Sequence, residues 1–287
     1  MRRKMMGLAE AAALVRDGDL IALTHGVTLD TAPMGLLRQL LRQGLKALRL
    51  VGVTGGGLGA DLLLGAGALQ EVETCHMALG DLGVAPNFQR LVEAGRARVK
   101  ENTCGVLLSQ AGAGAMGVPF VPVRGLLGSD LLKVRPDFTV AQNPFSPGER
   151  VVLAPAVTPD VVLFHATLAD VWGNFFVRGR RDELTLAQAS RRVLVTAERV
   201  VEGPLTPRDG EGAFIPSFYT SAVVHLPFGA HPTPCPGLYE ADLDYLHEYI
   251  AAARSEEGFR AYLEKYVYGV RDEAEYLERV GVAARGG

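Results

Sequence analysis

The sequence predicts an α/β fold, with an open and mainly parallel sheet and flanking helices. Two observations in the first half of the 287-residue chain predict it. Short apolar runs alternate regularly with segments that have the spacing of amphipathic helices, and the runs themselves are continuously apolar. Continuous apolar runs are typical of strands that are buried on both faces. Regular alternation of such strands with helices implies right-handed crossovers between parallel strands.

The elements of the first half follow in order from this pattern. An initial amphipathic helix is predicted over residues 8–16, and Gly18 ends it. Four strands come next, and each precedes a helix. These strand and helix pairs are predicted at 19–25 and 32–43, 47–53 and 60–68, 72–78 and 86–95, and 97–102 and 104–116.

The middle of the chain departs from the alternation. Residues 117–160 are rich in glycine and proline, yet they are too apolar for a flexible linker. Long ordered loops in compact domains are usually functional, so we expect an ordered loop layer near a site. The strand pattern resumes at 159–170 and again at 192–201, with a helical segment at 182–192 between them.

The C-terminal part of the chain, about 240–281, has the mixed charge and spacing of two or three amphipathic helices. The sequence contains no internal repeat and no low-complexity tract. We therefore expect a single domain over 1–287, with an α/β core to about residue 200 and a strand and helical segment over about 201–287.

Composition and charge exclude several classes of protein. With 29 basic and 32 acidic residues the net charge is −3, so no broad basic surface is available for nucleic acid or an anionic membrane. The longest uncharged stretch, 103–123, is interrupted by polar residues and prolines and is a poor membrane span. The basic N-terminus is followed by too short an apolar run for a signal peptide. We expect a cytoplasmic protein without nucleic-acid or membrane partners.

The three cysteines, Cys75, Cys104 and Cys235, are odd in number and widely spaced. This pattern predicts reduced thiols in a cytoplasm and no disulfide framework. Cys235 lies near His225 and His231 in the sequence, but these residues lack the close ligand pairs of structural zinc sites. We therefore expect hydrogen-bonded structural histidines and no metal.

The glycine motif Thr54-Gly55-Gly56-Gly57 lies between a predicted strand and a predicted helix. Gly55 and Gly57, with Ala60, satisfy the pattern of dinucleotide binding, in which backbone amides approach a pyrophosphate at a helix N-terminus. The motif follows the second strand of the chain, whereas the fingerprint belongs to the first. A turn that lines another ligand, or one that only packs tightly, is therefore the favoured interpretation. No Gly-Lys-Ser/Thr sequence follows a glycine run, which excludes a P-loop.

Glu101 falls at the C-terminal end of a predicted strand, just before a helix. Ligands of open α/β sheets bind at this edge. A carboxylate there is suited to act as a general base, an orienting group or a covalent nucleophile. The structural alternative is an acidic residue that the dipole of the following helix favours.

A second group of candidates lies in the glycine- and proline-rich middle of the chain. Arg124 precedes a turn that contains Gly128, Ser129 and Asp130. Backbone N–H groups beside a cation suit an oxyanion or a thioester carbonyl, although a tight turn with a surface arginine has the same sequence. His165, at the end of an apolar run, is either the edge of a site or part of a hydrogen-bonded turn. No nucleophile elbow of the Gly-x-Ser-x-Gly type occurs, so a serine triad has no support.

Several long segments with unusual sequences occur in a fixed order along almost the whole chain. They are GVPFVPVRGLLGSDLLK (117–133), NPFSPGE (143–149), PDVVLFHATLADVWGN (159–174), RRVLVTAERVVE (191–202), IPSFYTSAVVHLPFGAHPTPC (215–235) and EYIAAARSEEGFRAYLEKYVYGV (248–270). Read together, they resemble the A subunits of family I coenzyme A transferases of the glutaconate CoA-transferase type.

The resemblance implies an open α/β fold in which A and B subunits share ancestry and pack together as α2β2 or α4β4. It implies transfer of coenzyme A from an acyl-CoA donor to a carboxylic acid, with no permanently bound cofactor. The attacking group is a glutamate of the B subunit, within a Ser-Glu-Asn-Gly-like signature, which forms an acyl anhydride and then a glutamyl-CoA thioester. No such signature occurs here. This chain is therefore expected to be active only with a separate B subunit.

The resemblance also implies where the site lies. Glu101 is expected in a supporting catalytic role. In the family, a Gly-Gly-Phe-like turn follows the first strand, whereas this chain has LTHGV (23–27) there. His25 thus replaces a small residue near the acyl site, which bears on substrate identity. The residues expected to contact the acyl-CoA are His25, Gly26, Thr54, Gly55, Gly56, Gly57, Arg124, Gly128, Ser129 and Asp130.

Three other functions stay open at this point. A related branch of the scaffold hydrolyses a carbon–carbon bond in a cyclic ketone CoA thioester during steroid ring degradation, and Glu101 matches a glutamate that is important in its A subunit. A regulatory acyl-CoA-binding protein on the same fold would need no catalytic group. A nicotinamide-dependent oxidoreductase would use the glycine motif at 54–60.

Overall fold

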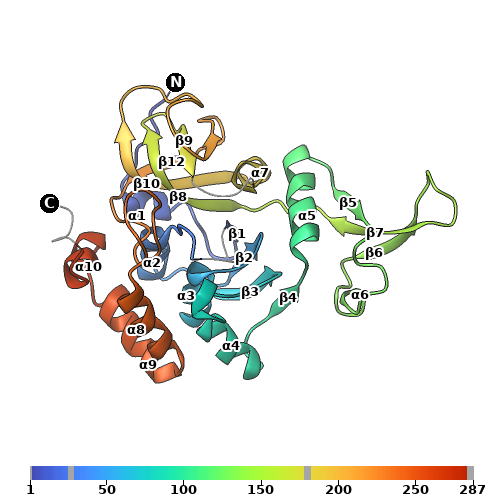
Figure 1. Ribbon diagram of the computed structural model, residues 1–287, viewed down its shortest axis with the longest axis horizontal. Coiled ribbons are helices and arrows are strands. Elements are labelled where there is room, and N and C mark those ends of the chain that lie inside the picture. The colour runs from blue at the N-terminus through green and yellow to red at the C-terminus, as the bar shows by residue number, and fades with distance from the viewer. Residues whose placement is uncertain (1, 25–28, 178–181, 283–287) are drawn as a thin grey trace.

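The computed structural model describes residues 2–24, 29–177 and 182–282 of the chain. Its centre is a nine-stranded sheet in which seven strands are parallel, while β9 pairs antiparallel with β8 and β11 (Figure 1). The order is β11-β9-β8-β1-β2-β3-β4, with β10 beside β8 and β12 beside β10. The predicted open, mainly parallel sheet is confirmed. The strands are β1 (Leu20–Leu23), β2 (Leu48–Gly52), β3 (Leu69–Thr74), β4 (Val99–Glu101), β8 (Val161–Asp170), β9 (Phe175–Val177), β10 (Arg192–Val201), β11 (Ala213–Ile215) and β12 (Ala222–His225).

Helices cover both faces of this sheet. Successive residues of a strand point to opposite faces, so Ile21 belongs to one hydrophobic core and Ala22 to the other, and Leu50 and Val51 divide in the same way. Two buried faces explain the continuous apolar runs of the sequence. The first core contains residues of α1 (Leu8–Ala12), α2 (Met34–Arg42), α3 (Leu58–Gly65), α4 (Pro86–Glu93), α8 (Leu243–Ala253) and α9 (Glu256–Leu263), and the second contains residues of α5 (Cys104–Met116) and α7 (Asp182–Ala189).

The predicted C-terminal helices are α8, α9 and α10 (Glu273–Arg279), and a π-helical turn (Glu264–Tyr268) follows α9. A buried polar group joins α10 to α2. Arg38 of α2 donates to the carboxylate of Glu273, lies 3.6 Å above the centre of the Tyr276 ring and donates to the backbone oxygen of His231. Arg42 forms a second ion pair with Glu273, at 2.6 Å. We call these five residues the arginine–tyrosine cluster.

A second, smaller sheet corrects the prediction of a loop layer over 117–160. Three antiparallel strands, β5 (Phe120–Val123), β7 (Arg150–Pro155) and β6 (Thr139–Gln142), lie in the order β5-β7-β6, with the short helix α6 (Leu131–Val134) between β5 and β6. The strands are short, and Pro122 lies on the edge strand β5, where a missing N–H is tolerated. Those features concealed the sheet in a sequence rich in glycine and proline.

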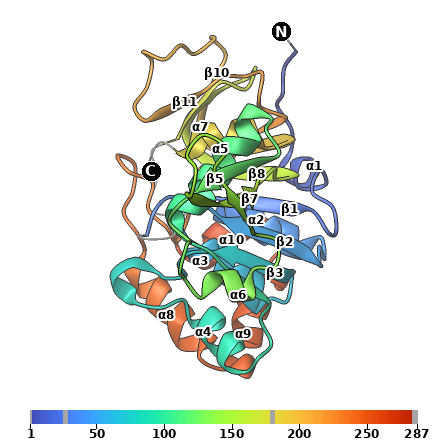
Figure 2. The ribbon, with the colours of Figure 1, turned by 90° about the vertical axis from the view of Figure 1, so that its right-hand side faces the viewer.

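The small sheet has its own core of Val106, Leu126, Phe138, Val152 and Ala154. It projects from the body beyond α5, and in the view turned by 90° it lies with α5 in front of the large sheet (Figures 1 and 2). Across the described ranges, no helix is both long enough and apolar enough to span a lipid bilayer.

Candidate functional site

Four parallel strands, β1 to β4, end at one edge of the large sheet. Their register places Leu23, Gly52, Thr74 and Glu101 side by side in one row across the four strands. The carboxyl edge, as we call it, consists of three segments at the ends of β2, β3 and β4: residues 54–57, 75–78 and 101–104. Open α/β sheets bind their ligands just beyond such an edge. The candidate site is therefore built from here.

The glycine turn after β2 has an unusual backbone. Thr54 has a φ of +66° and Gly55 a φ of +124°. A positive φ is strained for threonine, and such strain is often retained at functional sites. The turn also folds back tightly, because a Cβ atom on Gly52 would lie 2.5 Å from the backbone oxygen of Gly55. Glycine at position 52 is thus required by the close approach of two backbone segments.

Backbone hydrogen bonds join the glycine turn to the end of β3. The N–H of Gly56 donates to the oxygen of His76 at 2.7 Å, and the N–H of Ala78 donates to the oxygen of Gly56 at 3.3 Å. Gly57 occupies the N-cap position of α3 and has no side chain with which to cap it. The first amides of α3 are therefore not capped by a side chain, and residues 58–60, which carry them, are buried.

Glu101 ends β4, as the sequence predicts, and its side chain is exposed. Its backbone oxygen accepts a hydrogen bond from Arg135 at 2.7 Å. The guanidinium of Arg135 is almost completely buried and also binds the carboxylates of Glu73 and Asp137, at 2.7 and 2.8 Å. The hydrogen bond from Arg135 lowers the pKa of Asp137 to about 2.

Arg135 therefore fastens the small sheet to the carboxyl edge. It follows α6, and together with Lys100, Glu101 and Asp137 it lines a cavity of about 820 Å³. Sequence reasoning missed Arg135, because two of its partners, Glu101 and Glu73, lie 34 and 62 residues away along the chain.

The other residues predicted to contact the acyl-CoA lie in two parts of the structure, the small sheet with α6 and the turn after β2. Arg124, which follows β5 of the small sheet, forms an ion pair with Glu149. Gly128 has a φ of +79° in the turn before α6, where the hydroxyl of Ser129 donates to the oxygen of Leu126 and Asp130 pairs with Lys133. These groups have local partners in the small-sheet unit, whereas Thr54, Gly55, Gly56 and Gly57 follow β2 of the large sheet. His25 and Gly26 lie outside the described residues.

A disulfide at the carboxyl edge corrects one expectation. Cys75, just after β3, is bonded to Cys104, the first residue of α5, and their Cα atoms are 5.4 Å apart. The expected reduced thiols are wrong for this pair. The count and spacing of cysteines missed the bridge, because parallel pairing of β3 with β4 brings residues 29 positions apart into contact. Cys235 is buried and is not part of this bridge.

A buried polar group lies on β8 and β10, farther along the large sheet. The two ring nitrogens of His165 bind the hydroxyl of Thr196 and the carboxylate of Glu198, each at 2.7 Å. Glu198 also accepts hydrogen bonds from the hydroxyl of Tyr239 and the N–H of Phe228. Burial works against the charge of Glu198, but the hydrogen bond and the charge of His165 outweigh it and lower the pKa of Glu198 below its ordinary value.

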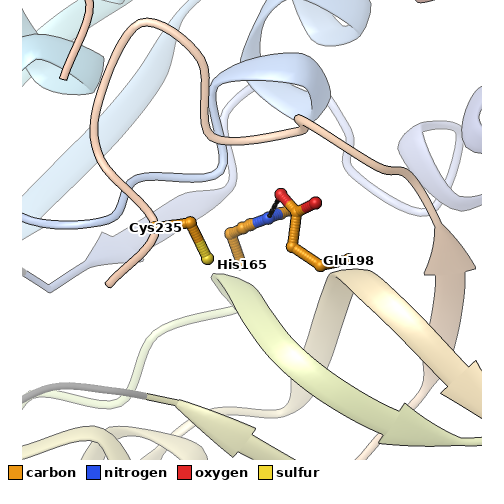
Figure 3. A group of neighbouring side chains, drawn as sticks. All are labelled: His165, Glu198 and Cys235. Atoms are coloured by element: carbon orange, nitrogen blue, oxygen red, sulfur yellow. Dashed lines mark hydrogen bonds and ion pairs between the residues drawn. The ribbon is translucent and has the colours of Figure 1, made fainter. Parts of the chain in front are cut away.

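The sulfur of Cys235 points toward His165 and Glu198 (Figure 3). One possible metal-binding atom from each of these three residues lies within 4.8 Å of the other two. Both ring nitrogens of His165 already have protein partners, so the arrangement is a hydrogen-bonded network of the β8–β10 pair. The two histidines near Cys235 in the sequence, His225 and His231, form hydrogen bonds of their own. His231 binds Tyr276 and Asp242, and His225 binds the backbone oxygen of Glu198.

Comparison with known proteins identifies the family. A family model described as coenzyme A transferase matches residues 5–226. The chain belongs to the coenzyme A transferase family. It is 33% identical to the A subunit of glutaconate CoA-transferase from Acidaminococcus fermentans, over 97% of this chain and 92% of that protein. It is also 33% identical to the A subunit of 3-oxoadipate CoA-transferase from Pseudomonas knackmussii, over 96% and 98% of the two chains.

The structural comparison agrees with the sequence comparison. The crystal structure of glutaconate coenzyme A-transferase from Acidaminococcus fermentans superposes with a TM-score of 0.90 and 31% identity, over 98% of this chain and 93% of that one. The resemblance to transferase A subunits of the glutaconate type is therefore confirmed. A relative from Archaeoglobus fulgidus, 37% identical over 99% of this chain, is longer, and the match spans 64% of it.

Proposed function

We propose that this chain is the A subunit of a cytoplasmic CoA-transferase that moves coenzyme A from an acyl-CoA to a carboxylic acid, together with a separate B subunit. One observation carries the proposal. Nearly the whole chain matches transferase A subunits in sequence, and it matches a transferase in structure with a TM-score of 0.90. The range that matches the family model, residues 5–226, includes the segments of the carboxyl edge.

The proposed chemistry begins on a glutamate of the B subunit. Its carboxylate attacks the thioester carbonyl of the donor, so that an acyl anhydride forms and the CoA thiolate leaves. The thiolate then attacks the glutamyl carbonyl of the anhydride, which releases the donor acid and leaves a glutamyl-CoA thioester. The acceptor carboxylate repeats these steps in reverse and restores the glutamate. Both intermediates are hydrolysed easily, so the two subunits must exclude water between them.

The carboxyl edge of this chain is proposed as the wall opposite that glutamate. Thr54 and Gly57, the half-buried residues of the turn, and the first amides of α3 would donate hydrogen bonds to the thioester oxygen, where negative charge develops. Gly55 and Gly56, whose N–H groups bind backbone oxygens, would shape the turn around the substrate. Glu101 would orient the acyl group or the acceptor, and His25 with Gly26 would limit the length of the acyl chain. Arg124 and the turn that contains Gly128, Ser129 and Asp130 would reach the same substrate from the small sheet.

The deciding experiment compares the chain alone with the chain co-purified with a B-subunit partner. Each sample receives glutaryl-, succinyl- or acetoacetyl-CoA with acetate, and mass spectrometry detects the new acyl-CoA. Transfer in the complex only, at an α2β2 or α4β4 mass, is the expected result. Carbon–carbon bond hydrolysis without an acceptor would replace the proposal with the ring-cleaving alternative, and acyl-CoA binding without turnover would replace it with a regulatory function.

Substitution of Glu101 tests whether this chain contributes an orienting group to the proposed site. In the complex, Glu101→Gln is expected to lower kcat/KM by about 10- to 100-fold, because an orienting contact is lost at the reacting centre. The matched control is Glu93→Gln, which changes another exposed glutamate, at the end of α4. Equal activity of the two variants would remove Glu101 from the site.

A further inference from the structure

The Cys75–Cys104 bridge joins the parts of the carboxyl edge that carry the candidate residues. Cys75 precedes His76, whose backbone oxygen holds Gly56 of the glycine turn at 2.7 Å. Cys104 follows Glu101 by three residues and begins α5. The last register pair of β3 and β4 is Thr74 with Glu101. The bridge therefore connects the segments that follow these two strands, just beyond their last paired residues.

Apart from the bridge, Asn102 and Arg135 hold the ends of β3 and β4 together, and Arg135 spans Glu73 of β3 and the backbone oxygen of Glu101. Neither contact includes the segment 75–78 or Cys104. The N–H of Asn102 donates to the oxygen of Thr74 at 3.2 Å, and the Asn102 amide binds Glu73 and Gln110. Beyond these contacts the segment 75–78 is tied to the glycine turn, and Cys104 is tied to α5. Opening the bridge would therefore allow the two halves of the carboxyl edge to separate while the sheet below them stays intact.

The bridge is also placed where a thiol reagent can reach it. Cys104 is exposed and Cys75 is half-buried. Accessible disulfides exchange more readily than buried structural ones. Cys104 is the first residue of a 13-residue helix with no acidic side chain in its first turn, and the positive end of a helix stabilises a thiolate released there. Both properties favour reversible exchange at Cys104.

We propose that Cys75 and Cys104 form a reversible redox pair that exchanges with low-molecular-weight thiols, and that the bridged state binds acyl-CoA more tightly than the reduced state. The second half of this statement rests on the proposed function. The first half concerns this chain alone.

The exchange balances with glutathione disulfide as the oxidant. The thiolate of Cys104 attacks one sulfur of glutathione disulfide, forms a mixed disulfide and releases one glutathione thiolate. The thiolate of Cys75 then attacks the Cys104 sulfur, which forms the internal bridge and releases the second glutathione thiolate. Two cysteines are oxidised, one glutathione disulfide is reduced to two thiols, and the two protons from the cysteines pass to these thiolates. Reduction follows the same steps in reverse.

Thermodynamic linkage makes the coupling reciprocal. If bridging strengthens acyl-CoA binding by some factor, acyl-CoA must strengthen bridging by the same factor. Couplings between sites are typically at least about fivefold, so we expect an effect of about this size in both directions. The two factors are measured by different methods, and a purely structural bridge would give a factor of one in both.

The first experiment titrates the full chain with glutathione and glutathione disulfide at fixed ratios, followed by acid quenching, alkylation with a maleimide and mass counting. Two alkylation sites should appear together as the ratio becomes more reducing, while circular dichroism stays native. Cys235 lies outside the pair, so its labelling should not change with the ratio, and it serves as the internal control. Cys104→Ser should abolish the two-site transition. Thiols that never bridge, or a bridge that opens only when the protein unfolds, would overturn the redox pair.

The second experiment measures acyl-CoA binding to the complex with its B subunit in the bridged and reduced states, and repeats the glutathione titration with saturating acyl-CoA. We expect the dissociation constant to rise about fivefold on reduction and the bridging constant to rise about fivefold with ligand. The Cys75→Ser/Cys104→Ser variant should bind like the reduced form under all conditions. Equal binding in both states would overturn the coupling. A normal redox titration in a complex that transfers no CoA would reject the proposed function and leave the redox pair standing.

Discussion

The arginine–tyrosine cluster and the carboxyl edge are both polar regions, but they use their polar groups in opposite ways. In the cluster, Arg38 and Glu273 are almost completely buried, and each charge has a partner at hydrogen-bonding distance. At the carboxyl edge the carboxylate of Glu101 is exposed, whereas Gly55 and Gly56 of the glycine turn, two strands away, are buried and donate their N–H groups to backbone oxygens. Charge density therefore does not mark a site in this chain. Exposure separates the buried ion pair of Arg38 and Glu273, which stabilises the fold, from the carboxylate of Glu101, which a ligand can reach.

The largest expected effect comes from breaking the cluster. Glu273→Ala leaves the buried guanidiniums of Arg38 and Arg42 without a carboxylate, so we expect a loss of about 3–5 kcal/mol in the free energy of unfolding. Urea denaturation followed by circular dichroism measures it. Glu256→Ala is the matched control, because its ion pair with Arg96 is exposed, and no measurable change is expected there. Equal stability of the two variants would show that the cluster does not hold α10 to α2.

A smaller loss of stability with a larger loss of binding is expected at the carboxyl edge. Gly52→Ala places a Cβ atom against the backbone of Gly55, so the glycine turn must shift, at about 1–3 kcal/mol. Because the turn moves, we expect acyl-CoA affinity in the complex to fall, as measured by calorimetry. Gly112→Ala in α5 is the control, since a Cβ atom there meets open space. Unchanged affinity in a destabilised Gly52→Ala variant would mean that the turn is only structural.

The smallest effect is expected where Arg135 joins the two sheets. The pKa of Asp137 is about 2 instead of its ordinary 3.8, so its ionised form stabilises the folded state. This contribution is complete above pH 3.8 and is lost as the pH falls toward 2. The side chain of Asp137 is 33% exposed, and solvent screens its ion pair with Arg135, so we expect no more than about 1 kcal/mol. Urea midpoints between pH 5 and pH 2 should fall less steeply for Asp137→Asn than for the wild type. Asp130→Asn, at an exposed pair with Lys133, should keep the wild-type slope.

Much of the fold could be predicted because its strands obey local rules. A continuous apolar run such as 47–53 indicates two buried faces within one segment. A glycine with a positive φ follows each of the helices α2 to α5 within two residues, so these helix ends are also local signals. The end of a strand is less certain. The predicted strand 72–78 extends past Thr74, where β3 ends, because the apolar pattern continues to Met77 and Ala78, which form isolated bridges with Gly56 and Val84.

The small sheet and the bridge could not be predicted, because they depend on contacts between distant residues. Phe120 pairs with Pro155, and only that register makes strands of two short segments rich in proline. The partners of Arg135 and the pairing of Cys75 with Cys104 likewise follow from the order of the strands. The position of Glu101 could be predicted, since the end of a strand and the start of a helix are both local signals.

The small sheet leaves the body and returns to it at one point. The N–H of Ala156 donates to the oxygen of Pro119 at 2.9 Å, and the N–H of Val157 donates to the oxygen of Gln110 at 3.0 Å. Apart from the contact of Arg135, a change of length within 120–155 would therefore leave β8 and the large sheet in register. The segment 120–155 can therefore change in length or be replaced without disturbing the large sheet. Insertions and deletions there can alter which substrate groups the small sheet contacts, while the large sheet keeps its geometry.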